Sequence, residues 1–224
     1  TTQNEGLADE ISQYLSGQSI QLGGSYTQSY FFLTNHTNSH GTLTDNGRAS
    51  PIIDYTSSEH ILYKFPMKNG DGVWGFNFTG SFGQPHLRYQ TYPGQSVLRG
   101  IDVNTHIDGD YLGVAPFVYL RLGPIYPGTD SYWLFGYGLG GALFHFSGLP
   151  EFDTTVNGKT TITAMPVSSS TKLFLYQTWK WQFHFGNWDI VGGFKELDSE
   201  RKVIGDYYAG YSEMLLGVDY SIRF

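Results

Sequence analysis

The sequence predicts an all-β fold, a single antiparallel up-and-down transmembrane β-barrel of about eight strands, and three observations lead to this prediction. Apolar and polar residues alternate with a period of two from residue 17 to the end of the chain, which is typical of strands with two different faces. Aromatic residues make up 17% of the 224 residues and charged residues only 15%, against roughly a quarter in an ordinary soluble domain. Connections between the expected strands alternate between long and short, as they do in transmembrane barrels.

The segment before the barrel, residues 1–16, has a different period. "LADEISQYL" places Leu7, Ile11, Tyr14 and Leu15 at helical spacing, with acidic residues near its start. We expect a short amphipathic helix here, or a frayed terminus that orders only on contact with a partner. The barrel then occupies residues 17–224 as one domain.

The expected strands follow one another in the same style. Each has one face of large aromatic and aliphatic side chains and one face of small, polar or charged side chains, and all five tryptophans lie near strand ends or on the apolar face. The strands cover residues 19–33, 53–65, 73–83, 111–122, 132–146, 172–185, 188–196 and 207–224. An even number of strands agrees with a closed barrel.

The long connections are expected at residues 34–52, 90–110, 147–171 and 197–206, and they would be extracellular loops. Short turns, including "MKNGDG" and "GN", would lie on the periplasmic side. An alternative is a barrel of ten strands, with a further hairpin hidden in the connection 147–171. A wider barrel of this kind would favour a pore.

The apolar face of nearly every strand requires a dry environment. A bilayer provides one, and a β-protein in a bilayer must close on itself to pair its backbone groups. The mean hydropathy of the whole chain is −0.27, and no apolar stretch reaches the 18 residues of a membrane helix. The soluble alternative is a β-sandwich or lipocalin-like barrel, but so many aromatic side chains would overfill its interior.

The last residues, "GVDYSIRF", carry a resemblance to a known class. With Tyr220, Ile222 and the closing Phe224 in alternation, this segment resembles the C-terminal signal of bacterial outer-membrane β-barrel proteins. The resemblance identifies the class and no subfamily. It implies the bacterial outer membrane as location, and the assembly machinery, outer-membrane lipids and lipopolysaccharide as partners.

An eight-stranded barrel has an interior that side chains fill. Charged residues on the polar faces are therefore expected to form an ion-pair network that occludes the lumen, although a substrate path through it is an alternative. These residues are Asp54, His60, Lys64, Arg121, Lys180, His184, Asp189, Lys195, Glu213, Asp219 and Arg223.

A catalytic site is a separate hypothesis. "NHTNSHG" brings His36, Ser39 and His40 together in the first long loop. The pattern also places Glu59 and His60 on the next strand, toward the same rim. A hydroxyl, an imidazole and a carboxylate are the groups that acyl transfer requires. In architecture alone, the chain is similar to outer-membrane lipid A acylases and deacylases, including the palmitoyltransferase, and no motif assigns their catalytic residues to it.

Other ligands find less support in the sequence. Asp108 and Asp110 in "HIDGD" offer oxygen ligands for calcium, but a solvated turn is the simpler interpretation. The chain has no cysteine, which excludes thiolate metal sites and disulfides. The net charge of −7 argues against nucleic-acid binding. We expect no cofactor.

The favoured function is that of a surface-exposed structural or binding protein, or a narrow pore for small solutes, with an extracellular or small-molecule ligand that the sequence does not identify. One alternative is a lipid-modifying enzyme, an acyltransferase or deacylase acting on lipid A or phospholipid. A second alternative is a channel for hydrophobic small molecules with a lateral exit, for which Pro116 would interrupt the strand ladder.

Overall fold

A computed structural model describes most of the chain. It covers residues 16–35, 38–90, 102–147, 151–156, 159–164, 171–199 and 208–224. The amphipathic helix expected within residues 1–16 lies outside these residues, apart from Ser16. In the described residues the strands are β1 (Ser19–Asn35), β2 (Asn38–Thr56), β3 (His60–Met67), β4 (Gly70–Gly83), β5 (His86–Gln90), β6 (Asp102–Gly123), β7 (Ser131–Phe146), β8 (Glu151–Val156), β9 (Lys159–Ala164), β10 (Thr171–Phe185), β11 (Trp188–Asp198) and β12 (Tyr208–Arg223).

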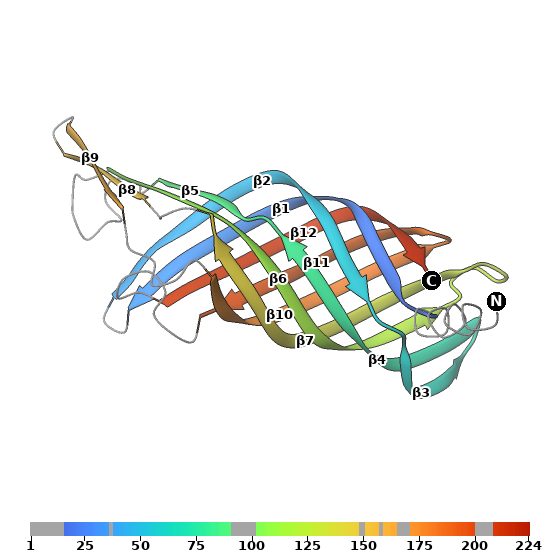
Figure 1. Cartoon of the computed structure of the whole chain (residues 1–224). Coiled ribbons are helices and arrows are strands. Elements are labelled where there is room, and N and C mark those ends of the chain that lie inside the picture. Colours follow the sequence, from blue (N-terminus) through green and yellow to red (C-terminus); the bar gives the residue numbers. More distant parts are fainter. Residues whose placement is uncertain are drawn as a thin grey trace, which may run out of the picture.

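These strands form one closed antiparallel barrel (Figure 1). β1 pairs with β12 from Ser19 opposite Arg223 to Thr34 opposite Tyr208, and this pairing closes the wall. β2 and β3 together make one wall strand, because both pair with β4, and β4 and β5 make the next, because both pair with β6. With β6, β7, β10, β11 and β12, the wall described here has the eight strands that the sequence predicts.

The hairpin of β8 and β9 does not widen the barrel. It lies in the connection 147–171, where the ten-stranded alternative places an extra hairpin. Apart from its hairpin partner β9, β8 pairs with the start of β6, from His106 opposite Glu151 to Asp102 opposite Thr155. β7 ends at Phe146 opposite Gly109, so β6 continues beyond the end of β7. The hairpin occupies that free edge, outside the wall.

The prediction of a loop at residues 34–52 is wrong. β1 continues to Asn35 and β2 begins at Asn38, and Thr34 pairs with Ser39. Likewise β6 begins at Asp102, within the expected loop 90–110, and β11 continues to Asp198. These strand ends carry mostly polar residues. An apolar pattern could not find them, because a strand outside the lipid needs no apolar face.

The outer face of the barrel is apolar and exposed. Leu216 is 55% exposed, Val218 48% and Leu112 53%, and the outward side chains of neighbouring strands are similar. The belt on β12 spans Met214 to Phe224, ten residue steps, which at about 3.3 Å each and a strand tilt of about 40° gives a height of roughly 25 Å. This is the apolar height of an outer-membrane barrel. The soluble alternative is excluded, since these side chains form no core.

The two ends of the barrel differ. The connections between β3 and β4, β6 and β7, and β10 and β11 lie at the same end as the start of β1 and the end of β12 (Figure 1). The tightest, Gly186–Asn187, needs glycine because its φ is +63°. Short turns are periplasmic in barrels of this kind, so we expect the opposite end, with β8 and β9, to be extracellular, and we name the two ends accordingly.

In the described residues, no helix is long and apolar enough to cross a membrane.

Candidate functional site

The structure places ten of the eleven expected lumen residues on the inner side of the wall. Among them, Lys64 pairs with the buried Val73 at the periplasmic rim, where it is 57% exposed and forms an ion pair of 2.7 Å with Asp71. His60 was assigned to the wrong face. The register between β3 and β4 shifts between Ile61 and Tyr63, so His60 pairs with Phe76 and both rings lie on the outer side, 6.1 Å apart. A bulge of one residue reverses the alternation, and the sequence gives no sign of it.

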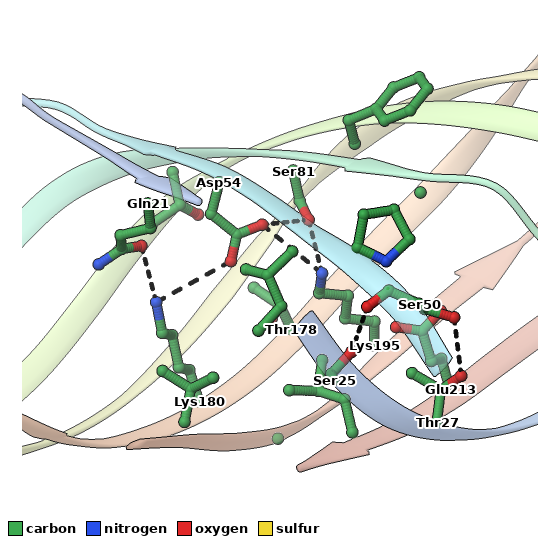
Figure 2. Close-up of a pocket in the computed structure, with 18 of the residues that line it drawn as sticks. Gln21, Ser25, Thr27, Ser50, Asp54, Ser81, Thr178, Lys180, Lys195 and Glu213 are labelled. Atoms are coloured by element: carbon green, nitrogen blue, oxygen red, sulfur yellow. Dashed lines mark hydrogen bonds and ion pairs between the residues drawn. The ribbon is translucent and has the colours of Figure 1, made fainter. Parts of the chain in front are cut away.

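The middle of the lumen holds a polar cluster, which we call the central cluster: Gln21, Asp54, Ser81, Lys180, Lys195 and Glu213 (Figure 2). Asp54 accepts a hydrogen bond of 2.7 Å from Ser81, and Lys195 donates to the same hydroxyl at 2.6 Å. The Lys195 ammonium lies 3.6 Å from one Asp54 oxygen, and the Lys180 ammonium lies 3.9 Å from the other.

The remaining charges of the central cluster are also compensated. Lys180 donates to Gln21 at 2.9 Å. Glu213 lies opposite Lys195 in the β11–β12 register and accepts a hydrogen bond of 2.5 Å from Tyr211, which in turn contacts Ser29 at 3.2 Å. Two lysines and two carboxylates thus balance in charge. The cavity between these side chains has a volume of about 50 Å³, enough for water but not for a solute.

An aromatic layer closes the lumen on the extracellular side of the central cluster. It consists of inward side chains that are at most 3% exposed, and we call it the aromatic plug: Tyr111, Phe144, Phe146, Phe174, Tyr176, Leu197 and Tyr211. Tyr111 lies 6.0 Å from Tyr211 and 6.4 Å from Tyr176 between ring centroids. The alternating pattern does not predict this layer, because it places the large apolar side chains on the face that contacts lipid. The available signal was the aromatic residues at inward positions of the extracellular half.

A second cluster, the rim cluster, lies near the periplasmic mouth: His184, Asp189, Gln182, Ser221, Arg223 and Asp130. Asp189 accepts hydrogen bonds from His184 and Gln182, both at 2.6 Å, and one from Ser221. Arg223 contacts His184 Nε2 at 2.6 Å and donates to Asp130 at 2.9 Å. These contacts join the end of β12 to β10 and to the β6–β7 turn.

Asp219 is the exception among the buried charges. It is 0% exposed and lies opposite Asp189 in the β11–β12 register, yet neither of its carboxylate oxygens accepts a hydrogen bond from a described residue. We therefore expect Asp219→Asn to leave the free energy of unfolding unchanged or to raise it slightly, because the amide has a similar volume and avoids a carboxyl group that is costly to ionise beside Asp189.

The matched control for Asp219→Asn is Asp189→Asn, which takes an anionic acceptor from three donors and should lower the same free energy by roughly 1–3 kcal/mol. Urea unfolding of both variants, followed by tryptophan fluorescence, measures the difference. Equal destabilisation by the two substitutions would contradict the prediction.

The structure does not assemble the expected catalytic set. His36 lies outside the described residues, and Ser39 and His40 lie on β2 near the extracellular end of β1. Glu59 and His60 follow Thr56, which pairs with Ser19 at the opposite end. The two groups are separated by some fifteen residues of strand, roughly 50 Å. The pattern did not show that β2 runs the full length of the barrel between them.

The other sequence candidates are placed as follows. Asp108 and Asp110 lie within β6, paired with β5 and β7, so this backbone is neither the expected turn nor a loop that curls around an ion. Pro116 interrupts the β6–β7 register, which passes from Val114–Gly141 to Phe117–Gly138 without a pairing between. Its inner side is covered by Phe117, which is 2% exposed.

The C-terminal residues of the expected assembly signal lie on the lipid face. Tyr220, Ile222 and Phe224 are 38%, 40% and 50% exposed. The Tyr220 ring packs edge-on against Trp188 at 5.2 Å, and its hydroxyl accepts a hydrogen bond of 2.9 Å from Asn187. These side chains form part of the aromatic girdle at the periplasmic interface. Their recognition by the assembly machinery remains a prediction.

Comparisons with known structures find bacterial proteins of low sequence identity. The chain is similar to the attachment invasion locus protein Ail of Yersinia pestis, with 18% identity, a TM-score of 0.42, and coverage of 92% of this chain and 99% of Ail. It is similar to Neisserial surface protein A, with 13% identity, a TM-score of 0.34, and coverage of 93% and 98%. It is also similar to the Pseudomonas putida toluene transporter TodX, with 9% identity, a TM-score of 0.24, and coverage of 96% of this chain and 92% of TodX.

No family model matches the chain, and no curated protein matches it. The protein is an outer-membrane β-barrel. Its closed register and its exposed apolar belt carry this assignment, and they also place its outer face in contact with membrane lipid.

Proposed function

We propose that the protein is a non-conducting barrel of the bacterial outer membrane that acts as a surface-exposed structural or binding protein at its extracellular end. The observation that carries this proposal is strand length. A membrane-spanning strand needs about 9–11 residues. β2 has 19 residues and β6 has 22, and the extra length lies at the extracellular end, with the β8–β9 hairpin beyond it (Figure 1).

The interior supports the same proposal. The aromatic plug and the central cluster are two layers in series, and both consist of buried side chains without a solute-sized passage between them. A channel would need to open both layers. The long, largely polar extracellular strands offer backbone and side chains to a partner outside the cell, whereas the lumen in this state offers no path.

The test compares conductance with surface exposure. Reconstituted in planar bilayers, the full chain should give no stable current steps, and lipid extracts of cells that express it should have unchanged acyl composition. Protease added to intact cells should cut within residues 35–50 or 147–171 and leave a membrane-protected core.

Four results would contradict the proposal. A stable conductance would make the protein a pore. Altered lipid A or phospholipid acyl chains would make it an enzyme. Cleavage of the extension only after the cells are permeabilised would reverse its orientation. Uptake of a hydrophobic solute that depends on Pro116 would favour the lateral channel.

A further inference from the structure

The periplasmic half of the lumen contains a second, larger cavity, which we call the vestibule. Its volume is about 460 Å³, and residues of β4, β6 and β10 line it together with the start of β1 and the end of β12. Ser58, Glu59, Asp130 and Arg223 surround its mouth at the periplasmic end, where the short turns lie. The vestibule adjoins the central cavity of about 50 Å³, with which it shares lining residues such as Gln21 and Lys180, and it lies at the opposite end from the β8–β9 hairpin.

The inner part of the vestibule has an aromatic wall. Phe117 and Tyr119 are 2% and 0% exposed and pack with Leu134. Phe117 lies over Gly136 so closely that a Cβ there would be 2.3 Å from its ring, and Tyr119 lies over Gly75 in the same way at 2.1 Å. Glycine is required at Gly136, because a side chain there would displace the ring of Phe117, which lines the vestibule. The sequence thus keeps the space open.

Asn77 also lines the vestibule, and its side-chain oxygen has no hydrogen-bond partner among the described residues. The residue is 3% exposed. A buried carbonyl of this kind costs free energy unless a donor reaches it. The donor must come from the cavity, as a hydroxyl or an amine of a bound molecule, or as water.

Arg121 offers the complementary chemistry nearer the mouth. Its Nη1 donates to Glu59 at 3.0 Å, and the guanidinium lies over the Tyr132 ring at 5.5 Å. A guanidinium presents a flat fork of donors that suits a carboxylate or a phosphate. Arg121 and Arg223 line the vestibule with their carboxylate partners Glu59 and Asp130, so an anion that binds here competes with Glu59 for the Arg121 guanidinium.

The register fixes the spacing of these two groups. Asn77 pairs with Phe117 and Arg121 pairs with Val73, so Arg121 lies four residues nearer the mouth on adjacent strands. Four residues of strand correspond to roughly 13 Å between backbone positions, and the arginine side chain shortens the gap. A ligand that satisfies both must be elongated, with an anionic group at one end and hydroxyl donors along the other.

We infer that the vestibule binds a small anionic polyol, a sugar acid or a sugar phosphate, from the periplasmic side. Its anionic group contacts Arg121, and a hydroxyl donates to Asn77 Oδ1. This site lies beyond the proposed extracellular function and does not depend on it, since the vestibule opens at the opposite end of a closed lumen.

Isothermal titration calorimetry on the full chain in detergent micelles tests this inference. The probes are gluconate and glucose 6-phosphate, with the neutral polyol sorbitol and the anion acetate as comparisons. Gluconate, glucose 6-phosphate or both should bind at least tenfold more tightly than sorbitol and acetate. Whether gluconate or glucose 6-phosphate binds shows whether the anionic group of the ligand is a carboxylate or a phosphate.

Two variants assign the binding to the vestibule. Asn77→Leu removes the buried carbonyl at similar volume, and the paired change Glu59→Gln with Arg121→Gln removes the guanidinium without leaving an unpaired carboxylate. Each should weaken binding of the anionic polyol at least tenfold. The matched control, Lys64→Gln with Asp71→Asn, removes an ion pair at the same rim outside the vestibule and should leave binding unchanged.

Heat-modifiable gel mobility confirms that each variant is folded. The inference is overturned if the folded wild-type chain binds neither anionic polyol, if sorbitol or acetate binds equally well, or if both sets of vestibule variants bind like the wild-type chain.

Discussion

Replacing Lys195 with methionine is expected to lower the free energy of unfolding by about 3–5 kcal/mol, the cost of removing one partner from a buried ion pair. The Lys195 ammonium lies 3.6 Å from Asp54 and donates to Ser81 at 2.6 Å, and Glu213 lies opposite it on β12. Without the ammonium, two buried carboxylates share only Lys180 as a counter-charge. Denaturant unfolding in detergent micelles, followed by fluorescence of the five tryptophans, measures the change.

Two further variants make this prediction specific. Asp54→Asn combined with Lys195→Met should recover part of the loss, because the two buried charges then disappear together. Lys64→Met at the exposed rim, where the partners are 57% and 46% exposed, should cost less than about 1 kcal/mol. If Lys195→Met costs no more than Lys64→Met, the central cluster does not hold the lumen together.

Conductance should appear only when both layers of the lumen are removed. Tyr111→Ala with Tyr176→Ala opens the aromatic plug, and Asp54→Ala with Lys195→Ala opens the central cluster while removing the ion pair as a unit. Because the layers act in series, either one alone should still block ions. The combination of all four substitutions should give steady single-channel currents in planar bilayers, whereas the wild-type chain gives none.

Heat-modifiable mobility is again the control for folding, since truncating buried aromatic side chains costs about 3–5 kcal/mol each. A current through the plug variant alone would show that the central cluster is no barrier. A folded quadruple variant without any current would show that a further part of the lumen blocks the path.

The sequence predicts the parts of this fold that the lipid dictates. Alternation on β6, β10 and β12 gave the correct outer face, because each outward residue such as Leu216 must meet hydrocarbon. The same rule could not find the extracellular part of β2, whose sequence is mostly polar. It also failed at β3, because one bulged residue near Leu62 reverses the faces without changing composition.

The candidate site was predictable in its charges but not in its geometry. Asp54 and Lys195 could be assigned to the lumen from alternation, yet their contact through Ser81 depends on strands β2, β4 and β11, which only the closed barrel brings together. The separation of Ser39 from Glu59 follows from the length of β2. The wall of the vestibule depends on Gly136 beneath the Phe117 ring, a relation that needs the register between strands.

The contact of Arg223 with His184 and Asp130 has a consequence for how the barrel is completed. If β12 paired with β1 one residue out of register, every side chain on it would change face, so Arg223 would point into lipid and Ile222 into the lumen. The correct pairing is therefore distinguished from its neighbours by the contacts of Arg223 with His184 and Asp130 as well as by the hydrophobic belt. Arg223 therefore favours the correct register of β12 when β12 pairs with β1 to close the barrel.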